Sequence, residues 1–164
     1  MKFANIDWHT AKISDFGKVV TGSTPSTKHT EFYGGKYPFI TPTDIDNTSR
    51  FIHTARFLSE TGYKNQESRI LPAGTICVVC IGATIGKICI THAPSFTNQQ
   101  INSIVVDKSK FDNKFVYYLL STQVQEIKNI AKGKDINPAH IKKDELIPLR
   151  HQKASPNMPN VLPR

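Results

Sequence analysis

Short apolar runs separated by glycine, proline, threonine, asparagine and serine fill the chain from about residue 15 to residue 106. This texture predicts strands and loops, because strands are short and such turn-forming residues bound them. The expected strands are Gly17 to Val20, Tyr37 to Thr41, Ile76 to Ile81, Lys87 to Thr91 and Ser103 to Val106. The run from Ile76 is apolar throughout, so we expect it to be central in its sheet.

A helical spacing of apolar residues appears only in the second half of the chain. One helix is expected from Lys114 to Lys132, where apolar residues recur at three- and four-residue spacing: Val116, Leu120, Val124, Ile127 and Ala131. Asp112 or Asn113 can cap its first turn, and Gly133 can end it. These elements predict an α/β fold: a single compact domain of short mixed or antiparallel strands with one main amphipathic helix in the C-terminal half.

The end of the chain has a different composition. Asn137-Pro138 predicts another short turn of helix, because asparagine caps a helix and proline favours its first position. After residue 150 there are prolines at 156, 159 and 163 and little apolar pattern. We therefore expect a domain over residues 1–149 and a disordered or non-native tail over residues 150–164.

Charge narrows the class of partner. The 164 residues include 21 Lys and Arg against 13 Asp and Glu, which gives a net charge of +8. Eight of the lysines lie between residues 108 and 143 against three acidic residues, a net of +5 in that stretch. An excess of this size favours polyanions such as nucleic acid, although a solvated surface explains such a run equally well.

Compartment and redox state follow from two further features of the sequence. No apolar run approaches the ~20 residues that cross a bilayer, and the N-terminus has no apolar signal-peptide core, so a cytoplasmic location is expected. The chain has three cysteines, an odd number, which makes reduced thiols the expected state.

Three motifs imitate catalytic or metal chemistry. Cys77-x-x-Cys80 with Cys89-x-x-His92 has zinc-ligand types, but cysteines three apart in a strand point to opposite faces, so no metal is expected. Gly82-x-x-x-Gly86-Lys87 is one residue short of a phosphate-binding loop and precedes a strand pattern. Asp112, Glu126 and Lys128 could form a metal-dependent nuclease site, yet Glu126 and Lys128 are expected on an exposed helical face and point in different directions. No cofactor is expected, and a binding module is favoured over an enzyme.

An ordered series of motifs over residues 8 to 149 resembles the target recognition domain of a type I restriction-modification specificity subunit. The series begins with Gly22-x-Thr24-Pro25, Phe32-Tyr33-Gly34-Gly35 and Tyr37 to Ile45, and it continues with Pro72-Ala73-Gly74-Thr75, Gly82 to Lys87, Phe96 to Gln100, Val116 to Leu120 and Ile147-Pro148-Leu149. Most of these motifs are expected to serve the scaffold. Asn98 and Gln99, for example, carry amides that can tie loop backbone together.

The resemblance implies a non-catalytic domain that binds duplex DNA and recognises a half-site of three or four base pairs. It also implies partners: a methyltransferase (M) subunit and a restriction (R) subunit that perform the catalysis. Most of the expected DNA contacts lie in the segments between the motifs, because arginine, lysine, asparagine and glutamine can bind base edges or phosphates. They are Ser26, Lys28, His29, Thr43, Asn47, Arg50, Lys64, Asn65, Gln66, Arg69, Lys87, Lys132 and Lys134.

The chain departs from the family pattern in its length. In the family that it resembles, a full specificity subunit carries two recognition domains separated by long helices. Here a single recognition domain is followed by Arg150 to Pro156. The expectation is a subunit truncated to a single half, which could pair with a second half-subunit. Two alternatives stay open: an enzyme, either a fragment of a fused restriction-methylation protein or a small nuclease, and an interaction piece with no DNA role.

Overall fold

The apolar runs of the sequence form a four-stranded antiparallel sheet in the computed structural model, which describes residues 8–9, 12–46, 49–132 and 151–152. Its strands are β2 (Gly17–Thr21), β5 (Ile76–Val79), β6 (Ile88–Ile90) and β8 (Ile101–Val106), in the order β2-β8-β5-β6. All four residues of β5 are buried, and the strand lies between β8 and β6. The prediction that this run is central is therefore confirmed.

Both faces of the four-stranded sheet are covered by apolar side chains. Alternate residues of β5 point to opposite faces, so Ile76 and Val78 join the cluster on the helix side while Cys77 and Val79 join the cluster on the other side. The helix-side cluster also contains Phe16, Val116, Leu120 and Ile127, all nearly inaccessible to solvent. Burial on both faces explains why β5 is apolar at every position.

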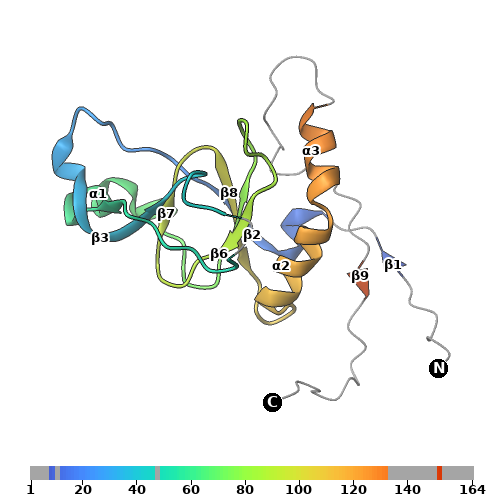
Figure 1. Ribbon diagram of the computed structural model, residues 1–164. Coiled ribbons are helices and arrows are strands. Elements are labelled where there is room, and N and C mark those ends of the chain that lie inside the picture. The colour runs from blue at the N-terminus through green and yellow to red at the C-terminus, as the bar shows by residue number, and fades with distance from the viewer. Residues whose placement is uncertain (1–7, 10–11, 47–48, 133–150, 153–164) are drawn as a thin grey trace.

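A second, smaller sheet lies beside the first. Its long strand β3 (Tyr33–Ile40) pairs antiparallel with β4 (Phe57–Leu58) and parallel with β7 (Phe96–Thr97). Strand β3 begins four residues before the predicted start, and the two short strands were not predicted. Figure 1 shows this sheet and helix α1 (Glu60–Gln66) at the end of the molecule opposite to helices α2 (Asn113–Thr122) and α3 (Val124–Lys132).

The prediction of one helix from Lys114 to Lys132 is wrong in one respect, because the helix is divided in two. Helix α2 (Asn113–Thr122) ends at Gln123, and α3 (Val124–Lys132) begins directly after it. The Thr122 hydroxyl donates to the Leu119 carbonyl at 2.7 Å, and the Gln123 N–H donates to the Leu120 carbonyl, three residues back. These bonds replace the regular i to i−4 pattern and end the first helix.

The predicted helix start is confirmed. The Asp112 carboxylate accepts hydrogen bonds from the backbone N–H groups of Lys114 and Phe115 at 2.8 and 3.0 Å. This is the N-cap arrangement that satisfies the free donors of a first helical turn. Asp112 therefore has a structural role in place of the nuclease role considered for it.

The segment from Lys64 to Arg69, which carries four of the expected DNA contacts, is helical. It forms the end of α1 and a following 3-10 helix, η3 (Glu67–Arg69). The Ser59 hydroxyl caps α1 by accepting the Gly62 N–H at 3.1 Å. Serine before an acidic first turn was the available signal, but α1 has too few apolar residues to show a helical period.

Residues 82–86 lie in the hairpin that joins β5 to β6, which pair antiparallel. Gly86 has φ +87°, and a Cβ there would meet the Val124 side chain at 2.9 Å and Lys128 at 3.1 Å. Glycine is needed both for this backbone conformation and for the close approach of α3.

Two short strands join the ends of the described chain. Strand β1 (Trp8–His9) pairs antiparallel with β9 (His151–Gln152), which falls within the predicted tail. The domain boundary at residue 149 stays a prediction. Gly133 and the helix start expected at Asn137-Pro138 lie outside the described residues. Within the described part, no helix has the length and apolarity needed to cross a membrane.

Candidate nucleic-acid interface

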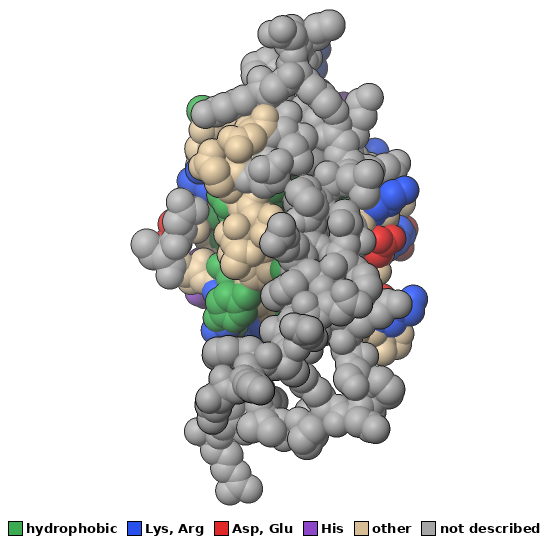
Figure 2. Space-filling model, turned by 90° about the vertical axis from the view of Figure 1, so that its right-hand side faces the viewer, with side chains coloured by type: hydrophobic (Ala, Val, Ile, Leu, Met, Phe, Trp, Pro, Cys, Tyr) green, Lys and Arg blue, Asp and Glu red, His purple; other side chains and the backbone are tan. Residues whose placement is uncertain are grey.

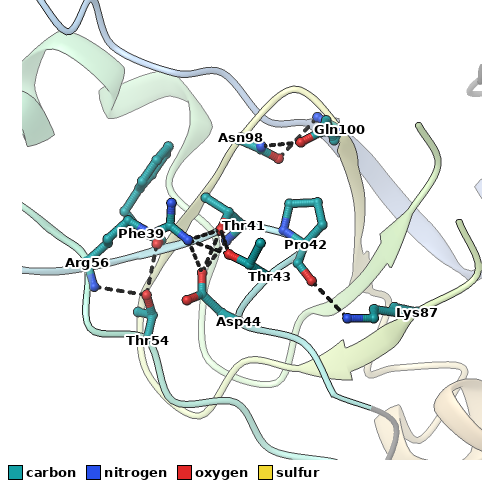
Figure 3. A network of polar contacts seen from close by, with 10 residues as sticks. All are labelled: Phe39, Thr41, Pro42, Thr43, Asp44, Thr54, Arg56, Lys87, Asn98 and Gln100. Atoms are coloured by element: carbon teal, nitrogen blue, oxygen red, sulfur yellow. Dashed lines mark hydrogen bonds and ion pairs between the residues drawn. The ribbon is translucent and has the colours of Figure 1, made fainter. Parts of the chain in front are cut away.

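Two of the motifs, Tyr37 to Ile45 and Phe96 to Gln100, meet where strands β3 and β7 end. The two strands are parallel, with Ile40 opposite Thr97, so the residues that follow each strand emerge at the same edge. The Asn98 N–H donates to the Ile40 carbonyl at 3.1 Å and joins the two segments. Figure 3 shows the loop from Thr41 to Asp44 beside Asn98 and Gln100, with the side chain of Lys87, the residue before β6, pointing toward Pro42.

Arg56 organises the loop that follows β3. Its Nη2 donates to the hydroxyl oxygens of Thr41 and Thr43, the latter at 2.6 Å, and lies 3.4 Å from the Asp44 carboxylate (Figure 3). That carboxylate also accepts the Thr41 N–H and hydroxyl, both at 2.8 Å. Thr43 is exposed, as expected for a DNA contact, but Arg56 fixes its oxygen. Sequence reasoning missed Arg56, which lies in no recognisable motif.

Lys87 is placed as a link between two segments. Its ammonium group donates to the Pro42 carbonyl at 3.3 Å, which holds the hairpin against the loop after β3. The residue is half-buried. An ammonium group has three donors, so a DNA contact remains chemically open to Lys87.

The amides of the segment Asn98-Gln99-Gln100 bond within the protein, as the scaffold interpretation predicted. Asn98 accepts the Gln100 N–H at 3.1 Å and donates to the Gln100 side-chain carbonyl at 2.9 Å. The Gln99 side-chain carbonyl accepts the Thr24 hydroxyl at 2.6 Å. The Thr24–Gln99 bond ties the loop after β2 to the segment after β7.

Most of the predicted contact residues lie at the end of the molecule formed by the smaller sheet. The loop after Pro25 leads into a 3-10 helix, η2 (Thr30–Phe32), which packs against α1. The Ser59 N–H donates to the Phe32 carbonyl at 2.9 Å and joins the two segments. Two stretches far apart in the sequence thus lie side by side, and their exposed predicted residues are Ser26, Lys28, His29, Lys64, Asn65 and Arg69.

Gln66 differs from its neighbours because it is buried. Its side chain is 8% exposed, donates to Asn65 at 3.0 Å and accepts from Arg69 at 3.4 Å. This arrangement gives Gln66 an internal role in holding the other two side chains.

His29 lies next to an acidic group. Its Nδ1 is 2.9 Å from the Glu31 carboxylate, and its ring packs 5.1 Å from the Phe32 ring centroid. A backbone hydrogen bond and the bond from His29 lower the pKa of Glu31. The carboxylate therefore stays charged beside the histidine and offsets part of the local positive charge.

Arg50 lies apart from this end and contacts α2. Its Nη1 donates to the Tyr118 hydroxyl at 2.8 Å, and the residue is half-buried. Tyr118 was not among the predicted site residues, because its place in the helix pattern gives no sign of a polar contact.

The model of the type I restriction modification DNA specificity domain matches residues 5–147 of this chain. The chain belongs to this family. The match confirms the resemblance inferred from the motif series.

Two curated relatives are specificity subunits of type I restriction enzymes. The specificity subunit of the type I restriction enzyme HindI from Haemophilus influenzae is 39% identical over 128 residues, which is 77% of this chain and 28% of the relative. The specificity subunit of the enzyme MjaIX from Methanocaldococcus jannaschii is 38% identical over 132 residues, 77% of this chain and 30% of the relative. The chain thus spans less than a third of each relative.

Solved structures confirm the fold of this specificity domain. It matches the HsdS subunit from Thermoanaerobacter tengcongensis with a TM-score of 0.61 at 12% identity, over 90% of this chain and 35% of that one. It matches the type I S subunit from M. genitalium with a TM-score of 0.59 at 20% identity, over 92% and 36% of the two chains. It also matches a chain from a structure that describes complex assembly of the type I system, with a TM-score of 0.65 at 14% identity, over 91% of this chain and 35% of that one.

The described residues of the specificity domain do not form the phosphate-binding or metal sites considered above. The stretch from Gly82 turns into strand β6, as expected, and not into the helix that follows a phosphate-binding loop. Cys77 and Cys80 are buried on opposite faces of the sheet, as expected. The described residues contain no group of three potential metal ligands, and the Glu126 side chain is not described.

Three predicted contacts cannot be placed in the specificity domain. Asn47 and Lys134 lie outside the described residues. Lys132 ends α3, and its side chain is not described. All three stay predictions from the sequence.

Proposed function

We propose that this chain is a non-catalytic module that binds double-stranded DNA in a sequence-specific way and recognises one half of a bipartite site. The observation that carries the proposal is the family match over residues 5–147, together with relatives that are specificity subunits. The net charge of +8 supports it, since lysine and arginine that neutralise phosphates release counterions.

The proposed contact surface includes the exposed polar end formed by the first loop, α1 and η3. Ser26, Lys28, His29, Lys64, Asn65 and Arg69 are exposed there on segments held by the scaffold. Gln66 acts by holding Asn65 and Arg69 in place. Thr43, Arg50 and Lys87 extend the surface toward the four-stranded sheet, and Asn47, Lys132 and Lys134 are included on sequence grounds.

The module is proposed to act with partner subunits in the cytoplasm. A methyltransferase (M) subunit and a restriction (R) subunit would supply the catalysis, and a second half-subunit would supply the other half of the site. Support comes from the family, since one of the similar structures describes assembly of a type I complex. Copurification of this chain with an M subunit encoded beside it is the direct test of that partnership.

DNA recognition is tested by selecting duplexes from a randomised pool with the 164-residue chain. The selected and scrambled duplexes are then titrated at two salt concentrations. A single module buries only about 600–1,000 Å² on DNA, so we expect weak binding that falls steeply with salt and prefers the selected sequence. Binding that shows neither sequence preference nor salt dependence would contradict the proposal.

A further inference from the structure

Arg50 is fixed in both its backbone and its side chain. Its carbonyl accepts the Ile90 N–H at 2.9 Å, and the next residue, Phe51, forms a parallel bridge with Ile90. Strand β6 is at the edge of the four-stranded sheet, so this segment extends that edge. The side chain of Arg50 points toward helix α2, where its guanidinium group donates to the Tyr118 hydroxyl. Sheet and helix together set the direction of one arginine.

Two aromatic rings hold the guanidinium group. Its central carbon lies 5.4 Å from the Phe51 ring centroid and 5.6 Å from that of Tyr118, within the range of cation–π contacts. Both rings are exposed, at 42% and 54%. In Figure 2, which faces the side carrying α2 and α3, exposed hydrophobic side chains lie next to lysine or arginine side chains.

No carboxylate in the described part of the chain pairs with Arg50. The acidic residues of the preceding loop have other partners, since Asp44 bonds to Arg56 and Asp46 accepts the Ser49 N–H at 2.7 Å. The Arg50 Nε is buried without a hydrogen-bond partner. An ordered arginine that lacks an acidic partner is suited to a ligand from outside the chain, and its Nη groups are the donors left for that ligand because Nε is buried.

We propose that Tyr118 and Phe51 are positioning residues that orient Arg50 to donate to a pair of acceptor atoms on DNA. This inference rests on the proposed DNA-binding function. The acceptors are guanine O6 and N7 or two phosphate oxygens, which match the planar guanidinium fork equally well. Because an arginine loses side-chain entropy when it is ordered on binding, holding it in advance strengthens the contact.

The test uses substitutions that separate positioning from contact. Tyr118→Phe removes the hydroxyl that holds Arg50 and keeps the ring, and Tyr117→Phe is the matched control on the same helix. Arg50→Gln removes the fork. On the selected duplex we expect affinity to fall about 10- to 100-fold for Arg50→Gln and roughly 3- to 10-fold for Tyr118→Phe, with no change for Tyr117→Phe. Circular dichroism of each variant reports whether it is folded.

A double variant identifies the coupling. If Tyr118 acts through Arg50, adding Tyr118→Phe to Arg50→Gln costs no further affinity. A further loss of the full Tyr118→Phe effect would overturn the positioning role. Wild-type affinity for Tyr118→Phe, while Arg50→Gln is weakened, would overturn it too.

Sequence and salt dependence distinguish the two acceptor types. For guanine, Arg50→Gln relaxes the preference at one base pair, and Arg50→Lys restores it poorly because lysine lacks the fork. For phosphate, all sequences weaken alike, the salt slope falls by about 1, and Arg50→Lys restores most of the binding. Either pattern supports the proposal.

The inference and the proposed function fail in different ways. Unchanged DNA binding by Arg50→Gln, with or without a loss of M-subunit binding, would overturn the Arg50 contact and leave the DNA-binding function standing. A parent chain without sequence preference or salt dependence would overturn both.

Discussion

The two sheets of this domain differ in how they are stabilised. The four-stranded sheet is buried on both faces by aliphatic, cysteine and aromatic side chains. The sheet of β3, β4 and β7 has only Phe39, Leu58 and Phe96 in its buried cluster, surrounded by half-buried tyrosines. Polar bonds supplement this small cluster, such as that from the Tyr33 hydroxyl to the Pro25 carbonyl at 2.6 Å.

This difference separates stability from recognition. The well-packed sheet can hold the chain in one conformation, while the segments that pack beside the smaller sheet carry most of the exposed residues that we propose contact DNA. Such a division is expected because residues that bind a partner must stay exposed and gain little from packing. The substitutions below test whether the two regions differ as their packing indicates.

The largest effect is expected from cavities in the two cores. Ile104→Ala removes a side chain that is 1% exposed inside the larger cluster, and should lower the free energy of unfolding by about 3–5 kcal/mol. Leu58→Ala should cost about 2–3 kcal/mol, because the tyrosines around the small cluster can move into the space. Urea denaturation measures both. Equal or reversed losses would contradict the comparison.

Two glycines with positive φ form a matched pair across the regions. Gly86 (φ +87°) has Val124 and Lys128 against it, whereas Gly34 (φ +82°) has nothing within 4 Å of an added Cβ. Gly86→Ala should therefore cost roughly 2–4 kcal/mol from strain and displacement of α3, and Gly34→Ala about 1–2 kcal/mol from strain alone. Thermal unfolding of both variants tests this, and similar shifts in Tm would show that α3 does not restrict Gly86.

Alkaline pH should weaken the larger core through Cys80. Burial raises the pKa of this thiol from 9.0 to about 11. Between these values the unfolded chain loses the proton and the folded chain keeps it, so stability is present below pH 9 and falls as pH rises. Cys80→Val should make that fall shallower, by at most about 1.4 kcal/mol per pH unit. Identical pH profiles of unfolding free energy would show that the folded thiol titrates normally.

The smallest effect concerns single exposed lysines. Lys64→Gln at the proposed contact end should lower DNA affinity a few-fold and reduce the salt slope by about 1 if the side chain lies on a phosphate. Lys18→Gln is the control, since Lys18 is also an exposed lysine and lies on strand β2. If both variants lose the same affinity, the attraction comes from overall charge and the contact end has no special part.

Sequence patterns predicted the strands of the larger sheet well and its neighbour poorly. Burial on both faces makes β5 apolar at every position, which is visible without a structure. Strands β4 and β7 are two residues each, too short for any alternating pattern, and their pairing with β3 depends on contacts far apart in the chain. The end of α2 at Gln123 was equally hidden, because the apolar period continues across the break.

For the candidate site, the sequence indicated residue types but not their partners. It placed Lys28 and Lys64 in exposed segments, but it could not show that Gln66 is buried or that Lys87 bonds to the Pro42 carbonyl. The sequence also could not show that Arg56 and Tyr118 take part in polar contacts. Each of these contacts joins residues more than ten positions apart or depends on burial, which no local pattern encodes.

The sequence by itself determined the family, the scaffold motifs and the positive charge of this domain, because these depend on residue identity and order. Only the tertiary structure decided which side chains are exposed together. The parallel pairing of β3 with β7 brings Thr41 to Asp44 beside Asn98, and the packing of α2 against β6 brings Tyr118 to Arg50. Such neighbours are set by the free energy of burying the two cores, which is a property of the whole chain.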